Sequence, residues 1–188
     1  MFKNSLSISH YYIEKTVKEG DVVLDATCGN GNDTLFLAKL VGVRGHVYSF
    51  DVQEDALNNA KKLVEQNNVR GHVNFILDGH QNLDKYVEKP LSAGMFNLGY
   101  LPGGNHEIHT QGETTIPAIS KSLALLRSGG ILTIVIYYGG DSGFDEQIAV
   151  CEFIKTLDPK KFSALKHSFE NQPNCPPIAV VIQRLGTD

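Results

Sequence analysis

The chain has 188 residues, of which 41% are hydrophobic and 20% charged, with a formal net charge of −4 at pH 7. These values predict a single domain over residues 1–188 with a full core, and they speak against a nonspecific nucleic-acid binder. No apolar run is long enough to span a membrane and no signal-peptide core opens the chain, so we expect a cytoplasmic protein that binds no membrane.

Strand and helix patterns alternate along the chain, which predicts a mostly parallel sheet with helices on both faces. Helices are expected over 5–18, from 32 or 33 to 40, and over 54–67, 114–127 and 143–157. Strands are expected over 22–25, 46–50, 73–77, 94–98, 131–136, 162–169 and 178–184. A proline-rich connection joins the last two strands, so the sheet should end in an antiparallel hairpin. The predicted fold class is therefore Rossmann-like α/β with seven strands.

The first strand ends on Asp25 and breaks into a glycine turn that opens the next helix. In α/β proteins such a strand-turn-helix joint binds nucleotide-like ligands. Asp51 lies 20 residues beyond Gly31, at the end of the second strand. A carboxylate at that distance can hold the two hydroxyls of a ribose. The pattern therefore predicts a nucleoside site.

The glycine pattern of this turn speaks against a dinucleotide. Thr34 stands where a pyrophosphate site has its third glycine, and Asp25 and Asp33 flank the turn. Two carboxylates repel a pyrophosphate but suit a ligand with an ammonium and a sulfonium, which is S-adenosylmethionine. A turn that binds nothing and a nicotinamide site are the alternatives.

The three cysteines are widely spaced, which predicts reduced thiols rather than a zinc site. Cys28 lies inside the glycine turn, where a small side chain is needed. No base is evident beside it, so a catalytic thiol is not favoured.

Asp78 follows the third strand and Asn97 ends the fourth, so both belong to the edge of the sheet where ligands bind. Asp78 can accept a hydrogen bond from the adenine amine with His80 beside the base, or it can cap a helix. Gln53 can reach the ribose or the adenine edge, or it can be an ordinary polar residue at a helix start.

The segment 97–104, Asn-Leu-Gly-Tyr-Leu-Pro-Gly-Gly, is the predicted reaction centre, with a glycine-rich surface loop as the alternative. A polar Asn97 at an apolar strand end is costly unless it is hydrogen-bonded. His106 and His109 lack a third ligand at convincing spacing, so no metal is expected. Tyr137 and Tyr138 can stack a flipped base or pack at the sheet edge.

Taken in order, these motifs resemble a class I S-adenosylmethionine-dependent methyltransferase, with Thr27 in place of the first glycine of the usual loop. Over essentially its whole length the chain resembles the rRNA-methylase family of the YtqB or MnmM type. The segments that carry this resemblance are 25–34, 78–80, 97–104, 137–140, 171–172 and 176–177. Many members read His-x-Gly-Gly after the tyrosines, whereas this chain reads Gly-Gly-Asp-Ser-Gly, so no histidine contact is implied there.

Characterised members of this family methylate the aminomethyl nitrogen of a modified wobble uridine, at position 34 of tRNA. The resemblance therefore implies S-adenosylmethionine as cofactor, the tRNA anticodon stem-loop as partner and 5-methylaminomethyl-2-thiouridine as product. The expected cofactor residues are Asp25, Cys28, Gly29, Asn30, Gly31, Asn32, Asp51, Gln53, Asp78 and His80. The expected substrate residues are Leu101, Pro102, Gly103, Gly104, Tyr137 and Tyr138, with Asn97 and Tyr100 expected in catalysis.

Other functions stay open at this point. A methyltransferase for rRNA or for a small-molecule amine fits the same motifs, and a noncatalytic nucleotide- or RNA-binding module is the alternative from another class. Four lysines near the C-terminus form either a solvated face or an RNA footprint. They are Lys155, Lys160, Lys161 and Lys166. The sequence does not fix the oligomeric state, and a homodimer is one option.

Overall fold

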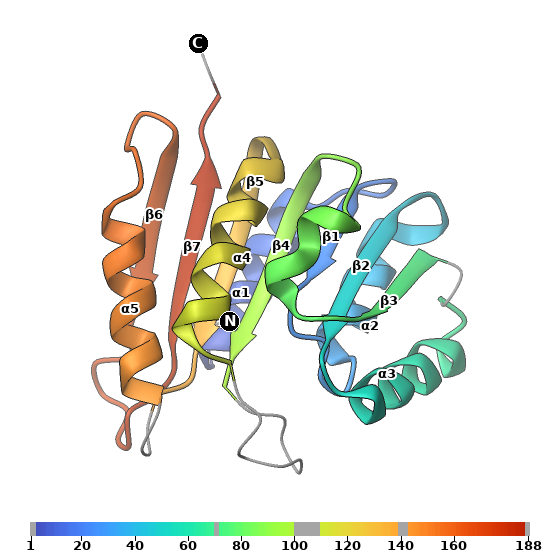
Figure 1. Ribbon diagram of the computed structural model, residues 1–188, viewed down its shortest axis with the longest axis horizontal. Coiled ribbons are helices and arrows are strands. Elements are labelled where there is room, and N and C mark those ends of the chain that lie inside the picture. The colour runs from blue at the N-terminus through green and yellow to red at the C-terminus, as the bar shows by residue number, and fades with distance from the viewer. Residues whose placement is uncertain (1–2, 70–71, 100–109, 139–142, 187–188) are drawn as a thin grey trace.

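The computed structural model describes residues 3–69, 72–99, 110–138 and 143–186, in which helices and strands alternate (Figure 1). The helices are α1 Ser5–Thr16, α2 Asn32–Val41, η1 Gly42–Arg44, α3 Glu54–Gln66, η3 His80–Lys85, α4 Gly112–Leu125 and α5 Gly143–Lys155. The strands are β1 Val22–Asp25, β2 His46–Asp51, β3 Val73–Leu77, β4 Leu91–Leu98, β5 Leu126–Ile136, β6 Phe162–His167 and β7 Ile178–Arg184. None of the described helices is long and apolar enough to cross a membrane.

The strands form one seven-stranded sheet in the order β3-β2-β1-β4-β5-β7-β6. The first five strands are parallel, whereas β7 runs antiparallel to both β5 and β6. The expected mostly parallel sheet with a C-terminal antiparallel hairpin is confirmed. The strand order reverses between β1 and β4, which opens a crevice at their carboxyl ends.

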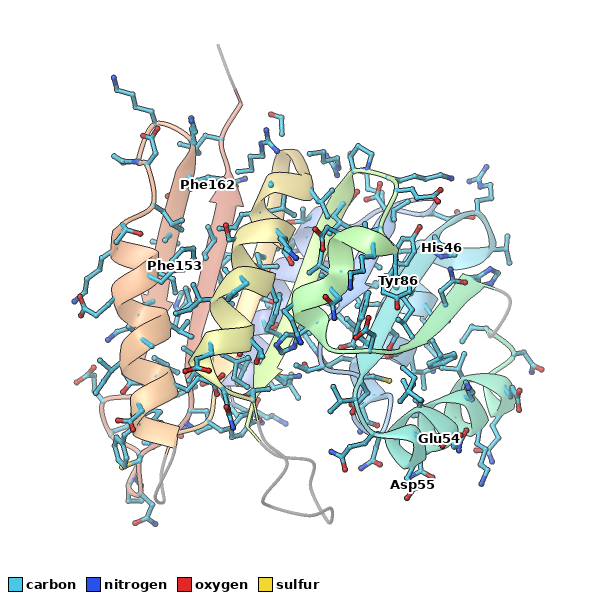
Figure 2. The ribbon with its side chains drawn as sticks, viewed as in Figure 1. His46, Glu54, Asp55, Tyr86, Phe153 and Phe162 are labelled. Atoms are coloured by element: carbon cyan, nitrogen blue, oxygen red, sulfur yellow. The ribbon has the colours of Figure 1, made fainter. Side chains whose placement is uncertain are left out.

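Helices cover both faces of the sheet. On one face α4, α5 and η3 lie over the larger core cluster, in front of the sheet in Figure 1. Phe153 of α5 and Phe162 of β6 are among the partly buried residues packed against this cluster (Figure 2). On the other face α1 and α2 pack against a second cluster that includes Val23 and Met95. The two layers fix the strand ends that carry the candidate site.

The fourth and fifth strands begin earlier than the sequence predicts, at Leu91 and Leu126 instead of 94 and 131. Leu126 pairs with Leu91 and is buried, and a register shift follows between Leu91 and Ala93. Gly129 lies in this irregular stretch with φ of +75°, a conformation that glycine adopts without strain. The Ser-Gly-Gly sequence, which is typical of a turn, therefore lies inside the strand.

Gly31 is the N-cap residue of α2 and brings this helix close to α3. Its φ is +84°, and a Cβ there would lie 2.6 Å from the Cβ of Ala60. Only a residue without a side chain fits this approach, so the glycine turn and α3 are packed as one unit.

Replacing Gly31 by alanine should lower the free energy of unfolding by about 2–5 kcal/mol, because a left-handed φ and a steric clash add together. The matched control is Gly129→Ala, which also has positive φ but has no described heavy atom within 4 Å of the added Cβ. This control should lose only about 1–2 kcal/mol. Denaturant unfolding measures both variants, and equal losses would contradict the close approach of α2 to α3.

Candidate active site

A cavity of about 910 Å³ opens at the carboxyl ends of the central strands, where the strand order reverses. Most of the residues expected at the site line it. They are Cys28, Gly29, Asn30, Asn32, Asp51, Gln53, Asp78, His80, Asn97, Tyr137 and Tyr138. Asp25 and Gly31 do not line the cavity. Tyr100, Leu101, Pro102, Gly103, Gly104, His106 and His109 lie outside the described residues.

Asp51 ties the glycine turn to the start of α3. Its Oδ2 accepts the N–H of Gly29 at 2.8 Å, and its Oδ1 accepts the N–H of Gln53 at 2.9 Å. Each carboxylate oxygen keeps a lone pair after one such bond. Asp51 therefore has a fixed orientation on the cavity wall and can accept further hydrogen bonds from a ligand.

Asp25, the last residue of β1, is hydrogen-bonded to the glycine turn. It is fully buried, and its carboxylate accepts the N–H of Thr27 at 3.1 Å and the hydroxyl of Thr34 at 2.5 Å. Thr34 is in turn 2.7 Å from the hydroxyl of Ser49 on β2. Thr34, which stands at the position of the third glycine, thus connects α2 with the end of β1 and with the middle of β2.

The pKa of Asp25 is raised to about 7, first by burial and then by the negative charge of Asp33, while the Thr34 hydrogen bond acts in the opposite direction. Burial also raises the pKa of the Cys28 thiol to about 12. A thiol with that pKa is protonated at neutral pH, so Cys28 fills space in the turn and does not act as a nucleophile.

The residues expected at the adenine lie between β3 and η3. Asp78 accepts hydrogen bonds from Gly79 N–H at 2.7 Å, from Asn82 at 2.9 Å and from the Tyr86 hydroxyl at 2.9 Å (Figure 2). The Asn82 hydrogen bond is the largest cause of the lowered pKa of Asp78. Asp78 therefore stays ionised at neutral pH and organises the start of η3.

His80 is buried on the cavity wall, and burial lowers its pKa. Its Nδ1 lies 3.1 Å from the carbonyl oxygen of Ala26. Because a carbonyl only accepts, Nδ1 carries the proton and Nε2 is left as an acceptor. A neutral His80 can thus accept one hydrogen bond from a ligand in the cavity.

Asn97 ends β4 at the cavity, and both its backbone and its side chain are held. Its N–H donates to the Thr27 hydroxyl at 2.8 Å, and its Nδ2 donates to Asp33. Its Oδ1 is buried without a hydrogen-bond partner among the described residues. A buried acceptor that lacks a donor is unfavourable, so this oxygen is where a ligand N–H or O–H would be gained.

The residues on either side of the segment 100–109 are hydrogen-bonded to each other. Gly99 N–H donates to the Thr110 hydroxyl at 2.9 Å, and Thr110 N–H donates to the Gly99 carbonyl at 3.0 Å. The buried Glu146 of α5 accepts the hydroxyls of Thr110 at 2.6 Å and Thr115 at 2.7 Å. Glu146 therefore holds Thr110, the residue that follows the segment 100–109, against α5.

The two tyrosines after β5 differ in environment. Tyr138 is partly buried against the larger core cluster and meets Phe144 edge-on, with ring centroids 5.8 Å apart. Tyr137 is 47% exposed. Tyr137 therefore has the free ring area for stacking on a base, whereas Tyr138 packs at the sheet edge.

Sequence reasoning missed several residues of the site. Glu146, Thr110 and Cys175 line the cavity, and His10 pairs with Asp33 at its wall. Each comes from a segment distant in sequence, and no local motif marks it. Asp33 was noted as a flanking carboxylate, but its bond to Asn97 depends on a contact across 64 residues.

A family model described as "Putative rRNA methylase" matches residues 47–183 of this chain. The chain belongs to this family. A tRNA (mnm(5)s(2)U34)-methyltransferase, chloroplastic, from Arabidopsis thaliana is 33% identical over 97% of this chain and 70% of its own length.

Two solved structures support the membership in the rRNA methylase family. One is described as an rRNA-methylase from Clostridium thermocellum, with 56% identity, a TM-score of 0.97 and coverage of 98% of this chain and 100% of that one. The other, a methyltransferase from Streptococcus mutans in complex with S-adenosylhomocysteine (SAH), has 43% identity, a TM-score of 0.90 and the same coverage. The protein is therefore an S-adenosylmethionine-dependent methyltransferase, and the expected cofactor is confirmed.

The raised pKa of Asp25 predicts a pH-dependent stability. With a pKa of about 7 in the folded state against 3.8 when unperturbed, the folded protein binds more protons between these values, so stability falls as pH rises through this window. Relative to Asp25→Asn, the wild type should gain about 2 kcal/mol between pH 8 and pH 5.5. Denaturant unfolding at both pH values measures this gain. A constant difference between the two proteins would show that Asp25 titrates as an ordinary exposed carboxyl.

Proposed function

We propose that this protein transfers the methyl group of S-adenosylmethionine to the aminomethyl nitrogen of 5-aminomethyl-2-thiouridine at position 34 of tRNA. The acceptor is suggested by the name of the Arabidopsis thaliana relative, which aligns with nearly the whole chain. The chemistry is suggested by one observation above all, the buried Oδ1 of Asn97 that has no partner among the described residues. An amine N–H is a donor of the right kind for this oxygen.

The residues of the cavity fit the cofactor. Asp51 can accept the ribose hydroxyls, and His80 Nε2 or Asp78 can accept the adenine amine. Gly31 offers no side chain to cap the first turn of α2, so the N–H groups of that turn suit the carboxylate of the methionine end. Bound S-adenosylmethionine supplies a methyl group that its sulfonium already activates.

The charge of the cavity favours cationic ligands. Four carboxylates line it, and no Lys or Arg lines its described part. They are Asp33, Asp51, Asp78 and Glu146. Such a wall attracts a sulfonium and an amine but repels phosphate, so the RNA backbone has to be held outside the cavity. The lysines near the C-terminus lie outside its lining.

Asn97 and Tyr137 would prepare the amine for attack. Asn97 Oδ1 would accept one N–H and aim the nitrogen lone pair, while the exposed ring of Tyr137 stacks on the uracil. The neutral amine would attack with its lone pair, so that the N–C bond forms as the S–C bond breaks, S-adenosylhomocysteine leaves and the methylated ammonium gives one proton to solvent. Loss of the first ammonium proton to solvent precedes binding.

Purified protein should methylate tRNA that carries 5-aminomethyl-2-thiouridine at position 34, with nucleoside mass spectrometry as the measurement. The same tRNA with 2-thiouridine at this position lacks the amine and should gain no methyl group. Asn97→Ala should lower kcat roughly 10- to 100-fold, as expected for one lost hydrogen bond to a polar or charged group. Full turnover by this variant would remove Asn97 from the mechanism.

The same assay separates the alternatives. Methylation of ribosomal RNA fragments or of a free amine, with none of the tRNA, would replace the proposed acceptor. The family description itself keeps rRNA as the second candidate. Absence of S-adenosylmethionine binding in calorimetry would favour a noncatalytic module and overturn the enzyme assignment for this chain.

Asp51→Asn should weaken S-adenosylmethionine binding roughly 10- to 100-fold, because a ribose hydroxyl loses a charged acceptor. The matched control is Asp55→Asn, the same chemical change at an exposed residue in the first turn of α3 (Figure 2). Calorimetry should give this control a Kd close to that of the wild type. Equal affinity of both variants would remove Asp51 from the cofactor site.

A further inference from the structure

We infer that His10 and Asp33 are positioning residues that hold the side-chain amide of Asn97 with its Oδ1 toward the acceptor amine. The inference rests on the proposed function for the identity of the amine. It goes beyond that function because neither residue needs to touch the cofactor or the substrate.

Asp33 connects a helix on one face of the sheet with the reaction side of the cavity. It lies in the first turn of α2, is 6% exposed and lines the cavity. Its Oδ1 lies 2.6 Å from Nε2 of His10 on α1, and its Oδ2 accepts the Nδ2 of Asn97. Both carboxylate oxygens are therefore engaged by the protein itself.

This contact decides which end of the amide faces the ligand. A side-chain amide has a donor end and an acceptor end, whereas an ionised carboxylate only accepts. Asp33 therefore selects the Nδ2 of Asn97 and leaves Oδ1 pointing away from it. That oxygen is the buried acceptor without a partner among the described residues. If the amide were reversed, an NH2 group would face the amine, and two donors would meet.

His10 fixes Asp33 from the side opposite Asn97. Its ring stacks on Phe36, with centroids 4.0 Å apart and an angle of 13° between the ring planes. The ring is therefore held by packing as well as by its hydrogen bond, and it fixes the orientation of the Asp33 carboxylate at the cavity wall.

The test exchanges the two polar groups. With the proton of His10 on Nε2, the new amide of Asp33→Asn accepts from His10 and offers its NH2 to Asn97, so Asn97 must reverse. In Asp33→Asn/Asn97→Asp, the amide at position 33 donates to the carboxylate at position 97. The second oxygen of that carboxylate then faces the amine as an acceptor. The double variant keeps one amide and one carboxylate but exchanges their positions, and it restores a hydrogen-bond acceptor that faces the amine.

Asp33→Asn should lower kcat for the tRNA roughly 10- to 100-fold, a larger factor than the accompanying rise in the KM for S-adenosylmethionine. The double variant should recover about tenfold of this loss. Asp84→Asn is the control, since it makes the same change in an exposed ion pair with Lys121. A double variant as slow as Asp33→Asn would overturn the inference, and so would wild-type kcat in Asp33→Asn. Loss of cofactor binding in Asp33→Asn would instead make Asp33 a ligand and also overturn it.

A second measurement needs neither tRNA nor cofactor. The NMR signal of the Asn97 side-chain NH2, assigned by its absence in Asn97→Asp, should exchange slowly with water in the wild type. In Asp33→Asn the reversed NH2 group loses its carboxylate acceptor and should exchange at least tenfold faster. Unchanged exchange would overturn the inference even if the tRNA is methylated. Faster exchange in Asp33→Asn would support the His10–Asp33–Asn97 contacts even if the methyl acceptor is not this tRNA. Failure of the inference and failure of the proposed function are therefore distinguishable.

Discussion

The site depends on the hydrogen bonds that the buried carboxyl of Asp25 accepts. It holds the backbone of the glycine turn at Thr27 and the first helical turn at Thr34, while Thr34 reaches Ser49 on the neighbouring strand. The end of β1, the start of α2 and the middle of β2 are therefore joined at one point beneath the cavity. The hydrogen bonds of Asp25 and Thr34 therefore fix the position of the turn residues that face the ligand.

Two threonines at glycine positions of the turn each form a hydrogen bond that a glycine could not form. Thr27 stands where the usual methyltransferase loop has its first glycine, and Thr34 stands where a pyrophosphate site has its third glycine. The sequence offers no reason for either threonine. In the structure the Thr27 hydroxyl accepts the backbone N–H of Asn97, and Thr34 bonds Asp25. The glycine turn is thus bonded to the predicted reaction centre. This bond fixes the cofactor side of the cavity relative to its acceptor side.

The sequence predicted the strand ends better than it predicted the contacts between them. Parallel strands ending on polar residues must gather those residues at one edge of the sheet, so the sequence alone predicts that Asp51, Asp78 and Asn97 lie together, and all three line the cavity. It could not show that Asp25 lies under the turn, since burial depends on the packing of α2. Glu146 and His10 were missed for a similar reason, because each meets its partner across a large sequence separation.

The clamp formed by Gly99, Thr110 and Glu146 has a consequence for how this protein can evolve. Because Gly99 and Thr110, which flank the segment 100–109, are bonded to each other and Thr110 is bonded to α5, we expect changes in the composition or length of this segment to leave Asn97 in place. Acceptor choice and methyl transfer are then separable properties of one chain. A relative could acquire a new substrate by exchanging this segment alone, while the chemistry that serves it is inherited intact.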